Sequence, residues 1–126
     1  MNREWREATE AGDLVRVARL LDAGGDVDSL DEHGQTALMN AAHRGDIELA
    51  QLLIRRGADL NRTAKYRLTA LMLAVIGNHT EVVRLLVEAG ADVDLKGSKG
   101  GFDRTPLEYA EACGRADIAG ILRERG

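Results

Sequence analysis

One five-residue pattern recurs along this chain at a fixed interval. Gly-Ala-Asp, then leucine or valine, then asparagine or aspartate occupy residues 57–61 and 90–94, which lie 33 residues apart. A degenerate copy occupies residues 24–28, another 33 residues upstream. A repeat of this length indicates an array of one small structural unit.

Other columns keep the same spacing. Threonine, then alanine or proline, then leucine recur at residues 36–38, 69–71 and 105–107, and Trp5 falls in this leucine column of the first copy. A second leucine column contains Leu20, Leu53, Leu86 and Leu122. We expect both columns to pack between neighbouring units, because a helix pair cannot bury its apolar face alone.

The columns divide the chain into four copies within one domain, 1–126. The boundaries give an N-terminal capping repeat (1–30), two internal repeats (31–63 and 64–96) and a C-terminal capping repeat (97–126). The last copy is three residues longer, which places a longer loop within residues 97–104. The first opening helix offers a polar outer face suited to a cap, with Arg3, Arg6, Glu7 and Glu10. A chain that starts with methionine and stops at a column boundary suggests a whole small protein.

Each copy carries local signals for two helices and a turn. A threonine that can cap a helix precedes an alanine-rich apolar run, as at residues 36–44. Pro106 stands at the first helical position, where its missing N–H costs nothing. A second apolar run, as at residues 47–56, ends at Gly57. These signals predict an all-α repeat solenoid of stacked helix-turn-helix units with projecting β-hairpin-like loops, called fingers below.

The pattern from residue 31 to residue 59 closely resembles the ankyrin repeat, and the resemblance covers nearly the whole chain. It is specific because several columns recur together in three copies. Two columns depart from the family. Met39, Met72 and Glu108 stand where the family usually has histidine, so the hydrogen bonds of that histidine are not carried over. Arg67 stands where a fingertip glycine is usual.

Composition narrows the function classes. The net charge is −4, which argues against nucleic acid as the main partner. No apolar stretch approaches the ~20 residues of a membrane span, and the first residues lack the apolar region of a signal peptide. We expect a cytoplasmic monomer without a membrane or nucleic-acid partner.

Residues that could carry chemistry are scattered. His33, His43 and His79 have no metal-ligand spacing to one another or to Cys113 and should lie in different repeats or on different faces, so we expect solvated histidines. Residues 97–101 lack the Gly-Lys-Ser/Thr order of a phosphate loop. Aspartate pairs recur at one turn, residues 26 and 28 and residues 92 and 94, which indicates a structural role. We therefore expect no metal, no cofactor and no catalysis. A small metal-dependent hydrolase that uses the histidines and the last finger is the disfavoured alternative.

The resemblance implies a partner in the groove formed by the fingers and the exposed side of the first helices. The variable columns give the following candidate contact residues: Glu32, His33, Gln35, His43, Arg44, Lys65, Tyr66, Leu68, Ile76, Lys99, Phe102 and Arg104. The same columns add Glu10, Ser98 and Ala112. Tyr66 and Phe102 stand out as aromatic residues on fingertips, because aromatic side chains are enriched at binding hot spots. The alternative is that Phe102 folds onto its own loop and Tyr66 covers a repeat junction.

These features predict a non-enzymatic protein-interaction module, an adaptor or regulator of one protein partner. An inhibitor or immunity-type protein that occludes the site of a partner enzyme is a sharper alternative, which nothing in the sequence selects. Charged residues on the second helices, such as Arg55 and Glu88, are expected to form a solvated convex face.

Overall fold

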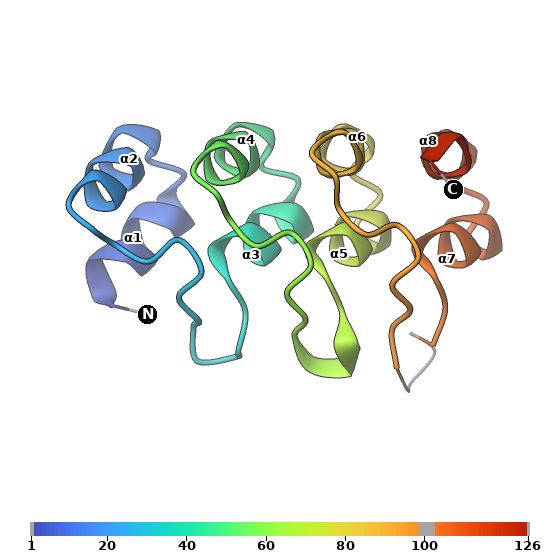
Figure 1. Ribbon diagram of the computed structural model, residues 1–126, viewed down its shortest axis with the longest axis horizontal. Coiled ribbons are helices and arrows are strands. Elements are labelled where there is room, and N and C mark those ends of the chain that lie inside the picture. Colours follow the sequence, from blue (N-terminus) through green and yellow to red (C-terminus); the bar gives the residue numbers. More distant parts are fainter. Residues whose placement is uncertain (1, 99–102, 126) are drawn as a thin grey trace.

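The computed structural model describes residues 2–98 and 103–125. In these residues the chain forms eight α-helices, one 3₁₀ turn and no β-strand. The helices are α1 (Arg3–Ala11), α2 (Leu14–Asp22), α3 (Ala37–Arg44), α4 (Ile47–Arg55), α5 (Ala70–Ile76), α6 (Thr80–Glu88), α7 (Pro106–Ala112) and α8 (Ala116–Arg125), and the 3₁₀ turn is η1 (Lys65–Arg67). Four helix pairs stand side by side, with the first helices in one row and the second helices in another (Figure 1). This arrangement confirms the all-α solenoid.

Side chains predicted to cap the helices do so. The hydroxyl groups of Thr36, Thr69 and Thr105 accept hydrogen bonds from the N–H three residues further on, at the start of each first helix. Asp13 and Asp46 cap α2 and α4 in the same way. Each cap satisfies a backbone donor that the helix leaves without an internal partner, and such a cap is worth about 1 kcal/mol.

The core lies between neighbouring pairs and consists mainly of alanine, leucine and valine side chains. Leu53, Leu86 and Leu122 are buried, whereas Leu20 of the first repeat is partly buried. The first helices approach one another through fully buried alanines, Ala41, Ala74 and Ala110. Helices pack mainly against the other helix of their own pair and the equivalent helices of adjacent pairs. The solenoid is therefore held together by contacts between neighbours.

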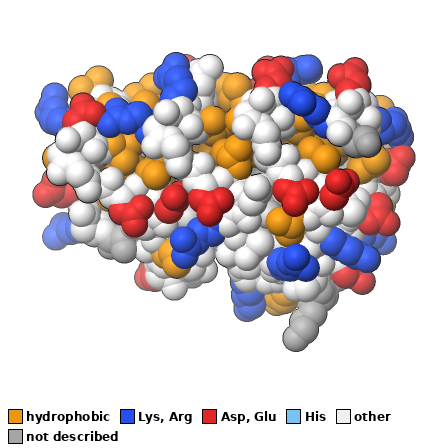
Figure 2. All heavy atoms as spheres, in the orientation of Figure 1, with side chains coloured by type: hydrophobic (Ala, Val, Ile, Leu, Met, Phe, Trp, Pro, Cys, Tyr) orange, Lys and Arg blue, Asp and Glu red, His pale blue; other side chains and the backbone are white. Residues whose placement is uncertain are grey.

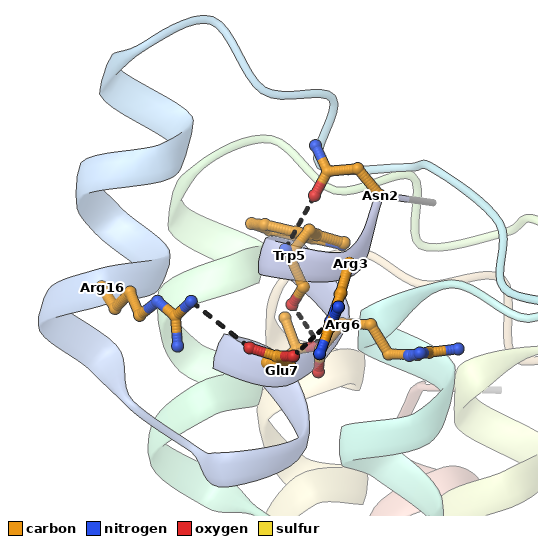
Figure 3. A network of polar contacts seen from close by, with 7 residues as sticks. Asn2, Arg3, Trp5, Arg6, Glu7 and Arg16 are labelled. Carbon is orange, nitrogen blue, oxygen red and sulfur yellow. Dashed lines mark hydrogen bonds and ion pairs between the residues drawn. The ribbon is translucent and has the colours of Figure 1, made fainter.

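The first pair closes the N-terminal end with one aromatic side chain and a polar surface. Trp5 is 3% exposed and fills the leucine column of this copy. Asn2 caps α1 by accepting a hydrogen bond from the Trp5 N–H at 2.8 Å (Figure 3). Glu7 lies 2.9 Å from Nε of Arg3 and 3.6 Å from a guanidinium nitrogen of Arg16, so an ion-pair network covers α1 and joins it to α2.

Three fingers project from one side of the helix rows (Figure 1). A backbone hydrogen bond joins the two arms of each finger, across residues 31–35 at 2.9 Å, residues 64–68 at 2.8 Å and residues 97–104 at 3.2 Å, and the first two fingers also have a turn bond at 3.0 Å across residues 31–34 and 64–67. A single bond of this kind does not make a strand ladder. In the described residues, the arms of the fingers are therefore open turns that only resemble a β-hairpin.

The turns after the second helices link successive repeats. The Asp28 carboxylate accepts a hydrogen bond from the Asp59 N–H at 2.9 Å, and the Asn61 side chain accepts one from the Asp92 N–H at 2.8 Å. Aspartates in the same turns also bond the N–H two residues further on. Figure 2 shows a row of acidic side chains between the helices and the fingers. The predicted structural role of the paired aspartates is thus confirmed.

Candidate partner-binding surface

Asp31 organises the first finger. Its carboxylate accepts hydrogen bonds from the His33 N–H at 2.8 Å, the Gln35 N–H at 3.0 Å and the Asn40 side-chain amide at 3.0 Å. Partial burial alone would raise the pKa of Asp31, but these hydrogen bonds outweigh it and hold the pKa below its ordinary value of 3.8. The tip presents Glu32 and His33, whose side chains are largely exposed and lie 3.8 Å apart.

The second finger holds its tip in a conformation that favours glycine. Tyr66 has φ 61° and Arg67 has φ 60°, within the 3₁₀ turn η1. Residues with a Cβ atom rarely adopt such angles, at a cost of order 1 kcal/mol or more each. Arg67 thus keeps the backbone of the glycine that it replaces. The Tyr66 side chain is 39% exposed, and the Lys65 ammonium group lies 5.2 Å from its ring centroid.

The second and third fingers are joined. The Ser98 N–H donates a hydrogen bond to the Tyr66 carbonyl at 2.7 Å, across the gap between the two loops. The tip of the second finger is therefore held by a neighbour as well as by its own turn. Two predicted contact residues of the third finger, Lys99 and Phe102, lie outside the described residues.

The structure corrects the predicted set of contact residues at Leu68, which is buried. Its side chain is only 9% exposed and belongs to the hydrophobic core. Leu68 lies at the base of the finger, next to the buried cap residue Thr69, so its side chain packs under the helices rather than at the tip. It is not available to a partner in this conformation.

The remaining predicted contacts lie at the far ends of the first helices. His43 and Arg44 are exposed and end α3, and Ile76 is half-buried and ends α5. An eight-residue helix such as α3 is about 12 Å long, so these residues are separated from the fingers by roughly that distance. The structure therefore joins the tip of the second finger to Ser98 of the third finger but leaves His43, Arg44 and Ile76 as a separate group.

Long polar side chains join the repeats at these helix ends. The Arg44 guanidinium donates to the Thr9 carbonyl at 3.1 Å, and the Arg115 guanidinium donates to the carbonyls of Val75 and Ile76. His79 Nε2 lies 2.8 Å from the His43 carbonyl oxygen. His79 is therefore not only solvated, because the last carbonyls of a helix lack an internal partner and attract such side chains.

A family model for ankyrin repeats, comprising three copies, matches residues 6–97. The chain belongs to the ankyrin repeat family. No curated protein matches it. Ankyrin repeats generally act as protein-interaction modules and are typically non-enzymatic. Helices α7 and α8 lie beyond the matched residues and pack as one further pair on α5 and α6.

The described part of this ankyrin-repeat chain offers neither a metal site nor a membrane-spanning helix. No three His, Cys, Asp or Glu side chains among residues 2–98 and 103–125 come together in a group that could hold a metal ion. In the same residues, no helix has the length and apolar character needed to cross a membrane.

Sequence reasoning missed several exposed cations of the ankyrin fingers. Arg62, Arg67 and Lys96 are exposed beside the predicted residues Lys65 and Arg104. Lys65 and Arg67 lie at the tip of the second finger, and Arg62, Lys96 and Arg104 lie near the bases of the two fingers. These five residues are called the basic fingertip surface below. The sequence could have indicated this basic surface, because all three lysines of the chain lie within residues 65–99. Figure 2 shows basic side chains on the lower part of the molecule, in the region of these two fingers.

The field of this surface acts on a neighbouring carboxylate. Glu108 accepts hydrogen bonds from the backbone and side chain of Thr105, and these bonds are the main reason why the pKa of Glu108 is lowered. The positive charges of Lys96 and Arg104 add to the effect. Cations from both arms of the third finger therefore influence the same small region.

Proposed function

We propose that this chain is a non-enzymatic adaptor or regulator that binds a protein partner through its fingertips and the exposed side of its first helices. The observation that carries the proposal is the second fingertip. Tyr66 is presented there on a strained backbone, and the Ser98 N–H of the next finger holds its carbonyl at 2.7 Å. Strained backbone is concentrated at functional sites, where the surrounding structure maintains it.

A rigid tip favours binding. A partner that contacts a preformed loop does not have to order it first, so less of the contact energy is lost as entropy. Tyrosine also contributes a large apolar area with few rotatable bonds, which suits it to the centre of an interface. A standard interface of roughly 800 Å² on each side would span several adjacent fingers.

The test begins with the partner itself. Tagged protein captures a partner from the source cell, mass spectrometry identifies it, and calorimetry measures its dissociation constant. We expect Tyr66→Ala to weaken binding by about 2 kcal/mol, roughly 30-fold, as for a hot-spot residue. Phe102→Ala is expected to do the same, which keeps the sequence-based prediction open to test.

The control variants lie on the opposite side of the molecule. Arg55 and Glu88 are exposed residues at the ends of second helices. Their replacement with alanine should leave the affinity nearly unchanged, and melting curves check that all variants are folded. Full binding by the Tyr66→Ala, Phe102→Ala double variant, together with loss of binding by Arg55→Ala or Glu88→Ala, would show that the partner uses another face.

A further inference from the structure

The charge of the fingers reverses along the array. The first finger has Asp31 and Glu32 and no lysine or arginine. Residues 62–68 hold three cationic residues and no carboxylate, and the third finger adds Lys96 and Arg104 beside Asp103. The basic fingertip surface therefore forms a local positive region on a chain of net charge −4.

The cations of this surface are distinguished by their number within two adjacent loops. Elsewhere in the described part of the chain, Arg3, Arg16, Arg44, Arg56, Arg84 and Arg123 are paired with carboxylates, and unpaired arginines such as Arg19, Arg55 and Arg125 are spread over three second helices. None of the five cations of the basic fingertip surface lies within 4.0 Å of a carboxylate oxygen in residues 2–98 and 103–125. Like charges gathered without directly paired carboxylates repel one another, so this arrangement favours a ligand that supplies negative charge.

We propose that the basic fingertip surface binds an extended, carboxylate-rich segment of the protein partner. The proposal rests on the proposed function and adds the chemistry of the partner. Guanidinium groups such as those of Arg67 and Arg104 can bind carboxylates through two parallel hydrogen bonds, and Lys65 and Lys96 add positive charge. Tyr66 lies among these groups and provides an apolar contact for the chain of the segment.

The spacing of the fingers predicts the spacing of the carboxylates. Packed helices lie about 8–10 Å apart, and the fingers follow the stacking of the helices. An extended chain advances about 3.3 Å per residue. Carboxylates about three residues apart would therefore meet successive fingers.

Carboxylates flank the basic fingertip surface and limit the length of an anionic ligand that can lie on it. This limit favours a short acidic peptide over nucleic acid. Asp59, Asp92 and Asp94 are exposed in the turns behind the fingers, and Glu32 is exposed on the neighbouring finger. A phosphate backbone that continued beyond two fingers would meet these negative groups (Figure 2). A short acidic segment can end before it reaches them.

The experiment uses a defined probe. A fluorescein-labelled peptide of five Glu-Ser-Gly units carries its carboxylates three residues apart, and a second peptide has the same composition with the glutamates contiguous. Fluorescence anisotropy measures the binding of each to the full chain at low ionic strength. We expect the spaced peptide to bind more tightly than the contiguous one, and its binding to weaken as salt is added.

Matched charge reversals locate the contact. The variant Lys65→Glu, Arg67→Glu, Arg104→Glu should bind the spaced peptide about tenfold or more weakly. The control variant Arg19→Glu, Arg55→Glu, Arg125→Glu has the same net charge, carries its changes at exposed positions of second helices, and should bind within twofold of the parent. Circular dichroism confirms that both variants are folded.

Two results would overturn this inference. One is equal weakening by the two triple variants, and the other is tighter binding of an oligothymidylate than of the spaced peptide. If the captured partner depended on Tyr66 and not on the five cations, the proposed function would stand and the acidic-segment inference would fail. If the partner bound the convex face instead, both would fail.

Discussion

At the scale of single residues, Gly45 and His79 show how neighbouring repeats are fitted together. Gly45 has φ 75°, and a Cβ atom at this position would lie 2.4 Å from His79 Nδ1. Gly114 occupies the equivalent turn of the last repeat with φ 69°, but a Cβ atom there would meet nothing within 4 Å. The two glycines share a backbone conformation and differ in what lies beside them.

Gly45→Ala should therefore destabilise the protein more than Gly114→Ala. Both changes place a side chain in the left-handed region, at a cost of about 1–2 kcal/mol. Gly45→Ala must also displace the His79 ring and its hydrogen bond to the His43 carbonyl, which is worth about 0.5–1.5 kcal/mol. Urea titrations measure the difference, and it should disappear when both changes are made in a His79→Ala background. Equal costs in the parent protein would contradict the predicted clash.

Asp31 makes the free energy of unfolding depend on pH in the acid range. Because its pKa is lower in the folded chain than its ordinary 3.8, the ionised form favours folding. This contribution is complete above the ordinary pKa and is lost as the pH falls through the lowered folded value. Asp31→Asn should lower the melting temperature near pH 7, and the gap to the parent should begin to narrow as the pH falls below about 4. Asp117→Asn, at an exposed position of α8, controls for the general effect of losing a carboxylate.

The predictability of individual residues depended on how local their interactions are. The caps Thr36 and Thr69 and the turn residue Asp28 could be predicted, because their partners follow within a few residues or recur with the period. Leu68 could not, since its burial depends on where the finger meets the helices. His79 could not either, because its partner lies 36 residues away.

At the scale of elements, position within the stack determines what a helix contributes. Helix α4 packs against α2 and α6 as well as against its own partner α3, whereas α8 packs mainly against α6 and α7. Leu53 and Leu122 occupy the same column and are both buried, at 0% and 1% exposure. Burial alone would therefore predict equal contributions from the two side chains.

Packing between neighbouring repeats instead predicts that Leu53 contributes more to the free energy of unfolding than Leu122. Leu53→Ala should cost about 2–5 kcal/mol, since it opens a cavity between helices that are fixed on both sides. Leu122→Ala should cost less, because the terminal helix can shift to fill the space. Urea titrations of the two variants provide the comparison. Equal losses would argue against a structure stabilised by neighbours.

The helices were more predictable than the fingers. Apolar periodicity and capping residues define each helix locally, whereas the backbone of Tyr66 and Arg67 depends on the closing bond of the finger and on Ser98 from the next repeat. The basic fingertip surface was missed for a similar reason. Its cations come from two loops, and the stacking of the repeats brings them together.

At the scale of the whole molecule, the 33-residue period was sufficient to predict the architecture, because each unit contacts mainly its neighbours. The period also supports our proposed division into repeats at 1–30, 31–63, 64–96 and 97–126. Which face binds a partner does not follow from the period, because every repeat exposes similar positions and only the side chains at those positions differ.

Removal of residues 97–126 tests this division. The change deletes α7 and α8 and exposes the faces of α5 and α6 that packed against them, so the free energy of unfolding should fall. The remaining three repeats meet the minimum of about three for a stable array, so residues 1–96 should keep a helical circular dichroism spectrum without urea. The urea midpoint should move to a lower concentration while a cooperative transition remains. Complete loss of helical signal would instead show that the last pair is part of one indivisible core, because a stack of neighbours should tolerate the loss of an end.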